Sequence, residues 1–396
     1  MILEITMKKS IDNLSCELKK ALALIDSKFS VDTVEWLASL YDKESGGFYY
    51  AVSSRDNDEF WVDIESIVQA ISILQRLGMI QFVDGKWDMP DWFREKSISY
   101  LLARQDESDG YFYDPQYRGI ADRAKKERNT GFAVSCLRDD LGAEPKYKTA
   151  AERVAEKKST ESSTASLSST DSIYDTEESF VAWLDHLVAS RPNSYFWGSD
   201  IASASSMIKA AGYNKVLANW LRTKQYAENG TFEKEFNMTA VNGVLKLVGV
   251  FEAAGEEYPY YDVFLDKVID FSREFTPGTA AECWNPLGAM KPIVRSLGNN
   301  LKPELKEKLQ NSLAELITNI ANKMDVFKKN DGGYSYAKEH SSLYSNNVIV
   351  GKALPEGDVN AMALMALVYL EVYDLVGAQH PAVWRQYKDY FFNLIK

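Results

Sequence analysis

The chain has 396 residues, of which 45% are hydrophobic and 12% aromatic, a composition that supports a large core and excludes a disordered protein. Its formal net charge of −12 argues against nucleic acid and anionic membranes as partners, because both require a basic surface. No shift in composition divides the sequence, so we expect one domain spanning 1–396.

The three cysteines, Cys16, Cys136 and Cys283, lie far apart in the sequence. Their number and spacing fit neither a disulfide framework nor a metal site, so we expect no bound metal. No phosphate loop or dinucleotide fingerprint is present, and no cofactor is predicted. The first twenty residues are interrupted by charges, and no later stretch approaches the roughly 18 apolar residues of a membrane span. A cytoplasmic protein without membrane partners is therefore expected.

Six stretches have the pattern of buried helices that begin at an N-capping side chain and end at glycine. The sixth is apolar on nearly every side, as a helix surrounded by protein should be. The predicted ranges are 63–78, 129–142, 200–212, 237–255, 285–298 and 358–377.

An amphipathic helical pattern precedes each of these stretches, usually separated from it by a turn that combines small residues with aromatic ones. The amphipathic ranges are 32–41, 91–104, 177–190, 214–227, 260–275 and 303–327. Six such pairs predict an all-α fold, an (α/α)6 toroid with an inner and an outer ring of helices. An open α-solenoid is the alternative, but the all-round hydrophobicity of the inner helices favours closure.

One segment departs from the pairs. Residues 152–172 are rich in serine and threonine and poor in large apolar groups, so burial cannot offset the entropy of ordering them. We predict a mobile insertion there, acting as a linker or as a lid.

The turn Asp331-Gly332-Gly333-Tyr334-Ser335-Tyr336, followed by a buried helix, resembles the turns of terpenoid cyclases and protein prenyltransferases. Similar six-hairpin barrels occur among glycoside hydrolases. The resemblance implies the toroid fold over most of the chain. It also implies, for cyclases, an Asp-x-Asp-Asp acid and, for prenyltransferases, a zinc ion. Both motifs are absent: Asp139-Asp140 lacks the cyclase spacing, and Gly333 stands where the zinc thiolate is expected after Asp331.

In a toroid, the turns before the inner helices gather at one end, so carboxylates near those turns should converge. The candidate catalytic acids are Asp63, Glu65, Asp200, Glu235, Glu282 and Asp358. Two carboxylates across such a mouth could cleave a glycosidic bond, one as acid and one as nucleophile or base. Helix capping is the simpler explanation for Asp63, Asp200 and Asp358.

Aromatic rings in the same turns could stack on the apolar face of a sugar. The candidate substrate-binding rings are Trp61, Tyr111, Trp197, Trp284, Tyr334 and Tyr336. For each ring, core packing is an equally good explanation. Arg123 or Arg128 could bind the carboxylate of an acidic sugar, although both belong to a charged run that favours solvent.

These features favour a small-molecule or oligosaccharide ligand: a carbohydrate-binding toroid that could hydrolyse glycosides. The first alternative is a terpenoid cyclase-like enzyme acting on an isoprenoid, with rings that stabilise carbocations. The second is a non-catalytic binding or scaffold protein of the same fold. The oligomeric state is left open by the sequence.

Overall fold

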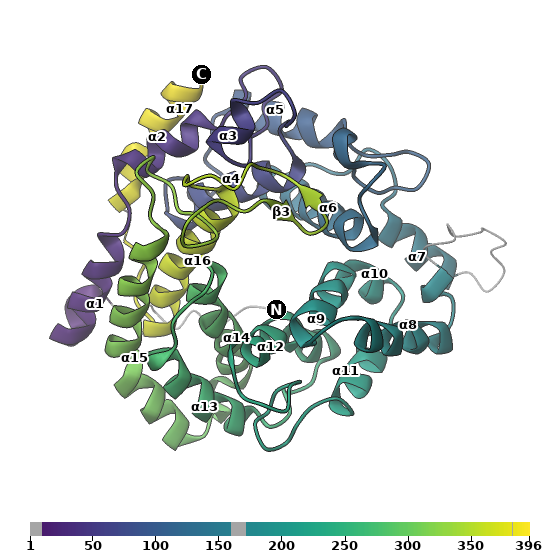
Figure 1. Ribbon diagram of the computed structural model, residues 1–396, viewed down its shortest axis with the longest axis vertical. Helices are drawn as coiled ribbons and strands as arrows, with labels where there is room; N and C mark the ends of the chain where they lie inside the picture. Colours follow the sequence, from purple (N-terminus) through teal and green to yellow (C-terminus); the bar gives the residue numbers. More distant parts are fainter. Residues whose placement is uncertain (1–9, 160–171, 382) are drawn as a thin grey trace.

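A computed structural model describes residues 10–159, 172–381 and 383–396. Within these residues, six helices form an inner ring (Figure 1). They are α4 (Ile64–Arg76), α6 (Arg123–Ser135), α9 (Ser194–Ser203), α12 (Met238–Ala254), α14 (Ala281–Leu297) and α16 (Val359–Val376). Each packs against the next in this order, and α16 returns to α4, so the ring is closed. The prediction of an (α/α)6 toroid is confirmed, and the open solenoid is not.

Six outer helices surround this ring. They are α2 (Val31–Ser39), α5 (Asp91–Leu102), α8 (Glu177–Ser190), α11 (Asn214–Arg222), α13 (Tyr261–Glu274) and α15 (Pro303–Met324). Helix α1 (Cys16–Asp26) packs on α15 and α16, whereas α17 (Lys388–Ile395) packs on α2. The remaining described helices are α3 (Val52–Arg55), α7 (Ala150–Ser159) and α10 (Ser205–Ala210), with a π-helical turn η3 at Cys136–Leu141 that ends the inner helix α6. Short 3-10 turns are η1 (Ile11–Asn13), η2 (Pro115–Tyr117), η4 (Ser172–Tyr174), η5 (Gly298–Asn300), η6 (Asp325–Phe327) and η7 (Val383–Tyr387).

Two small antiparallel hairpins interrupt the helices. Strand β1 (Phe82–Val83) pairs with β2 (Lys86–Trp87), and β3 (Tyr344–Ser345) pairs with β4 (Val348–Ile349). The second hairpin belongs to the long connection from α15 to α16. In Figure 1 this connection, coloured yellow-green, crosses the ring near α4 and α6. It therefore brings residues from the end of the chain to helices from its beginning.

The inner helices begin where capping side chains satisfy the free N–H groups of the first turn. Asp63 accepts a hydrogen bond from the backbone N–H of Ser66, and Asp358 accepts one from Ala361. At the other end, Gly255 and Gly377 follow their helices in the left-handed conformation. These local signals explain why sequence patterns located α4, α12 and α16 within one or two residues.

The aromatic turn is a recurring structural unit. In four of the described hairpins an antiparallel bridge closes it, and a glycine with positive φ follows the outer helix: Gly46, Gly110, Gly230 and Gly332. A Cβ at Gly332 would lie well inside van der Waals contact of the backbone oxygen of Asp32, next to the start of α2. The last turn therefore docks on the first outer helix, and Thr33 donates a hydrogen bond to the Gly332 oxygen at 3.2 Å. This contact is the seam of the ring.

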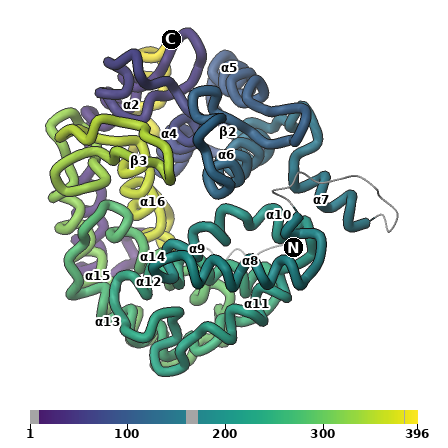
Figure 2. Tube along the Cα trace, turned by 45° about the vertical axis from the view of Figure 1, so that its right-hand side comes forward, coloured from purple at the N-terminus to yellow at the C-terminus, as the bar shows by residue number. Residues whose placement is uncertain are grey.

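The predicted insertion at 152–172 lies partly outside the described residues. Its first part belongs to α7, which projects from the outer ring in both views (Figure 2). Residues 160–171 are not described, so the prediction of mobility is not addressed. Of the described helices, α16 alone is long and apolar enough to cross a membrane, with a mean hydropathy of 1.6; 61% of it is buried as part of the inner ring.

Candidate functional site

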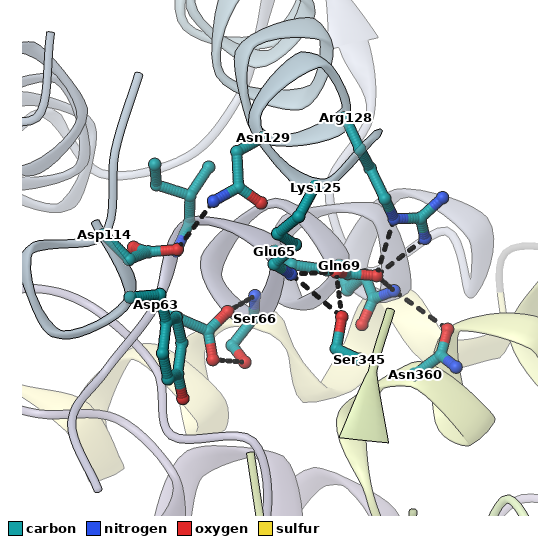
Figure 3. A network of polar contacts seen from close by, with 12 residues as sticks. Asp63, Glu65, Ser66, Gln69, Asp114, Lys125, Arg128, Asn129, Ser345 and Asn360 are labelled. Carbon is teal, nitrogen blue, oxygen red and sulfur yellow. Dashed lines mark hydrogen bonds and ion pairs between the residues drawn. The ribbon is translucent and has the colours of Figure 1, made fainter. Parts of the chain in front are cut away.

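Glu65 is the centre of a buried network at the start of α4 (Figure 3). Only 3% of the residue is exposed. Arg128 on α6 donates two hydrogen bonds to Oε1, at 2.6 and 3.2 Å. Oε2 accepts from the Lys125 ammonium at 2.9 Å and from the Ser345 hydroxyl at 2.6 Å. One carboxylate thus joins α4, α6 and the β3–β4 hairpin.

This environment keeps Glu65 ionised. Burial raises the pKa of its carboxyl, but the positive charges of Arg128 and Lys125 lower this pKa by more than burial raises it. The resulting pKa of Glu65 lies well below the ordinary value. Glu65 therefore has no proton to donate at neutral pH. It organises two cations instead of acting as an acid.

The network continues across the inner ring to α16. Gln69, one turn after Glu65, donates to Glu65 at 3.3 Å and to Asn360 at 2.9 Å. Lys125 also donates to the Ser345 hydroxyl at 2.9 Å. These contacts fix the side chains that face the middle of the ring on α4 and α16.

Two further carboxyl groups lie behind this network. Asp114 is 1% exposed and accepts hydrogen bonds from the backbone of Ile64 and from the Asn129 amide, both at 2.9 Å. Burial, with the nearby carboxyl of Asp63 next in effect, raises the pKa of Asp114 to about 7; Lys125 opposes this shift. Burial also raises the pKa of Asp63. The pair is thus coupled to the Glu65 network through Lys125.

The raised pKa of Asp114 should make the free energy of unfolding depend on pH, and Asp114→Asn should remove the part of this dependence that Asp114 contributes. Because its folded pKa near 7 exceeds an unfolded value of about 3.9, the folded state keeps a proton that the unfolded state releases. This group should therefore lower the free energy of unfolding by about 1.4 kcal/mol per pH unit between roughly pH 5 and 7. In Asp114→Asn this decline should disappear. Asn129 can rotate to offer the new amide its Oδ1, which has no hydrogen-bond partner in the described structure.

The measurement is urea unfolding from pH 5 to 8 for the parent protein and the variant. Taking the difference between the two removes the contribution of every group whose pKa the substitution leaves unchanged, so what remains comes from Asp114 and from its effect on Asp63. Parallel profiles would show that Asp114 titrates with an ordinary pKa in the folded protein.

Opposite Glu65, α12 contributes a lysine. The Lys246 ammonium lies 5.4 Å from the centre of the Tyr195 ring, and among the described residues no carboxylate pairs with it. Burial, followed by the charge of Arg128, lowers the pKa of Lys246 to about 8, with Glu65 opposing. Tyr195 in turn acts on Tyr336, whose pKa is raised first by burial and then by this neighbour. Six elements therefore contribute to one polar centre: the inner helices α4, α6, α9, α12 and α16, and the turn that contains Tyr336.

We call these residues the polar centre: Glu65, Gln69, Arg128, Tyr195, Lys246, Tyr336 and Asn360. Two of them, Arg128 and Lys246, are surrounded by protein but keep part of the side chain in contact with solvent. Desolvation acts strongly on Arg128 and Lys246, yet the Arg128 side chain remains 29% exposed and Lys246 is only half-buried. Both cations can therefore still be reached from solvent.

Aromatic and apolar side chains adjoin the polar centre. The Arg128 guanidinium lies 4.5 Å from the centre of the Phe132 ring. Trp284 on α14 is half-buried and donates to Glu371 on α16 at 2.9 Å. Glu371 also lies 3.5 Å from Lys291. The ring interior thus contains apolar rings next to charged groups.

The structure places the six candidate acids in different settings. Asp63 and Asp358 cap α4 and α16, and Asp358 accepts further hydrogen bonds from Tyr50, Tyr336 and Ser342. Burial raises the pKa of Asp358 to about 6. Of the six, Glu65 alone belongs to the polar centre.

The other three candidate acids lie elsewhere. Asp200 was predicted at a helix start, but α9 begins at Ser194, so Asp200 lies within the helix and pairs with Arg191 at 2.7 Å. Asn193 is the true N-cap, and the ring-rich run after it is helical. Glu282 accepts a hydrogen bond from the backbone of Gly278, whereas Glu235 is exposed.

The candidate rings divide between core and surface. Tyr111, Trp197 and Tyr334 are 1%, 4% and 1% exposed, so they fill the core instead of lining the mouth. Their hydrophobic mass packs the turns against neighbouring helices, as Trp197 does against Trp220. Trp61 is 55% exposed. Tyr336 belongs to the polar centre, whereas Trp284 is half-buried and contacts Glu371 on α16.

Several polar groups around Glu65 escaped the sequence prediction: Lys125, Lys246, Ser345 and the Gln69–Asn360 pair. Lys125 is hidden in a charged run that suggests a solvated surface, yet it is 1% exposed. Lys246 carries the clearest unused signal, because it is an isolated charge in the middle of an apolar inner helix. Ser345 comes from a hairpin that no sequence pattern indicated.

An open hollow of about 710 Å³ lies outside the ring, beside α7. Its charged lining is largely self-paired, since Arg138 contacts Glu144 and Glu152, and Lys148 contacts Glu156. It therefore offers a ligand little unsatisfied charge. Within the described ranges, no group of three His, Cys, Asp or Glu side chains is arranged to hold a metal ion.

Comparisons with known proteins give little beyond the fold. No protein-family model matches the sequence, and no curated protein matches it. Among solved structures, the chain is similar to a variant of MstE, a type II terpene cyclase from Scytonema, in complex with its product merosterolic acid A. The TM-score is 0.45 and the identity 12%, over 91% of this chain and 99% of that one. At this level no residue role is transferred from it.

Proposed function

We propose that the polar centre binds a small organic anion with an apolar or ring-bearing body. Its carboxylate or phosphate group would be held by Arg128 and Lys246. Arginine offers paired donors to such a group, and lysine adds a point charge. The body of the ligand would lie against Phe132, Tyr195 and Trp284.

The observation that carries this proposal is the unpaired Lys246. Desolvating an ammonium group without a counter-charge is costly, and the chain as a whole is acidic. Arg128 is already matched by Glu65, and Lys125 lies among Glu65, Asp63 and Asp114. Lys246 is therefore a cation that forms no ion pair among the described residues, as expected of a group whose partner is a ligand.

Two ligand sources share this chemistry: a phosphorylated isoprenoid and an acidic sugar. The half-buried rings suit either, since they can pack on an isoprenoid chain or on the apolar face of a sugar. Cleavage of a glycoside by paired carboxylates is not part of the proposal. Glu65 is held ionised, and Asp63 and Asp358 are engaged as helix caps.

A panel of charged and uncharged ligands tests the proposal. Calorimetric titrations would compare farnesyl diphosphate with farnesol, and a galacturonate trimer with a neutral galactose trimer. We expect the charged member of one pair to bind at least tenfold more tightly than its neutral counterpart, and the pair that responds identifies the source. Equal binding within both pairs, or no binding by any of the four ligands, would refute an anion site.

Lys246→Met should separate binding from stability. Removing an unpaired, desolvated ammonium should leave the free energy of unfolding unchanged or raise it by about 1 kcal/mol. The same change should weaken the charged ligand roughly 10- to 100-fold, the usual value of a charge-assisted hydrogen bond. Lys267→Met, on the exposed face of α13, is the control and should change neither. A marked loss of stability would mean that Lys246 has a structural role.

A further inference from the structure

Neighbouring helices restrict the position of the Lys246 side chain more than anion binding alone requires. It follows Leu245 on α12, and its Cβ packs so closely on α9 that a Cβ at Gly198 would lie 3.0 Å away. The stem is thereby fixed between two inner helices. The amine is left beside the Tyr195 ring, with Arg128 acting on it from α6. The amine thus lies within the polar centre, beside Tyr195 and in the field of Arg128.

We propose that Lys246 forms an imine with a carbonyl group of the ligand, which makes the ligand an anionic aldehyde or ketone. This inference rests on the proposed anion site: Lys246 and Arg128 would attract the anionic group, and Arg128 would keep holding it once the Lys246 nitrogen bonds to the carbonyl carbon. The neutral amine would attack the carbonyl carbon and form a C–N bond, while the carbonyl oxygen takes up a proton. The resulting carbinolamine would lose water to give the C=N bond. One water is released for each imine formed, and nothing is oxidised or reduced.

The surroundings of Lys246 favour the neutral amine that this step requires. With a pKa near 8, a substantial fraction of the amine is unprotonated at pH 8. Arg128 on α6 disfavours the ammonium form, Glu65 on α4 favours it, and Tyr195 faces it from α9. Lys291 on α14 is occupied by Glu371 and Asp374.

Lys246 and Lys328 have similar pKa values but differ in their hydrogen-bond partners. Burial also lowers the pKa of Lys328 to about 8. Its ammonium, however, donates to the Gly332 oxygen at 2.7 Å and to Thr33 at 3.2 Å, so it belongs to the seam. Lys246 has no such structural partner among the described residues. Lys328 is therefore a matched control of similar basicity.

Pyridoxal 5′-phosphate is a suitable probe because it combines an aldehyde with a phosphate. The intact protein would be incubated with it at pH 8, reduced with borohydride, and mapped by peptide mass spectrometry. We expect about one adduct per chain, at Lys246, and at least tenfold less labelling by pyridoxal, which lacks the phosphate. Labelling at Lys246 should be lost in Lys246→Arg and persist in Lys328→Arg.

The outcomes separate this inference from the anion site. Trapping that is spread over many lysines and unchanged in Lys246→Arg would overturn the imine. If a charged ligand of the panel binds the parent protein and Lys246→Arg equally while no adduct forms, the imine fails and the anion site stands. If no anion binds at all, both fail. Phosphate-dependent labelling confined to Lys246 supports both.

Discussion

Replacing Glu65 by glutamine is expected to lower the free energy of unfolding by about 3–5 kcal/mol, the typical cost of removing one partner from a buried ion pair. The substitution keeps the shape of the side chain but removes the carboxylate that forms an ion pair with both Lys125 and Arg128. Lys125 is 1% exposed, so solvent cannot replace the lost carboxylate. The new amide would also direct a donor at groups that are themselves donors.

Urea unfolding of the parent protein and Glu65→Gln at pH 7 would measure this loss. Glu59→Gln is the control: Glu59 pairs with Lys352 at 2.6 Å, but its side chain is 73% exposed. A surface pair of this kind contributes less than about 1 kcal/mol. A loss below about 1 kcal/mol in Glu65→Gln would mean that the network is not held together by this carboxylate.

Gly332→Ala should destabilise the ring at its seam by about 3 kcal/mol or more. Gly332 has φ of +97°, a conformation that costs other residues roughly 1–2 kcal/mol. In addition, the new Cβ would press on the backbone of Asp32, and overpacking adds about 1–3 kcal/mol. The obstacle is backbone and cannot move aside as a flexible side chain would.

Gly212→Ala isolates the backbone part of this effect. Gly212 has φ of +78°, but no atom lies within 4 Å of a Cβ built there. Gly212→Ala should therefore lower the free energy of unfolding by only about 1–2 kcal/mol. The difference between the two variants, measured by thermal and urea unfolding, reports the contact that closes the ring. Equal losses of stability in the two variants would show that the backbone at the seam moves to accommodate the new Cβ without further cost.

The fold could be predicted because its signals are local and repeated. Capping side chains such as Asp63 and Asp358, and terminal glycines such as Gly377, act on their own helix, so they can be read along the chain. The prediction was wrong where a residue of a type that commonly caps helices had another role. Asp200 resembled an N-cap, but Asn193 had already started that helix seven residues earlier.

The polar centre could be predicted only in part. Placing turns at one end of a toroid put Glu65, Tyr336 and Arg128 in one region, and the structure also brings these three residues together. It could not show that Glu65 would be neutralised by Lys125, because that pair spans 60 residues and depends on which faces of α4 and α6 meet. Nor could it show that Trp197 and Tyr334 fill the core.

By itself, the sequence indicated most of the helices and their pairing and favoured a closed ring, since capping, periodicity and hydrophobicity are properties of neighbouring residues. Only the tertiary structure decided the electrostatics of the centre. A pKa depends on burial and on charges brought together from distant segments, as Glu65 is with Ser345 across 280 residues. For the same reason, the structure alone revealed that Lys246 lies in the ring without an ion-pair partner among the described residues.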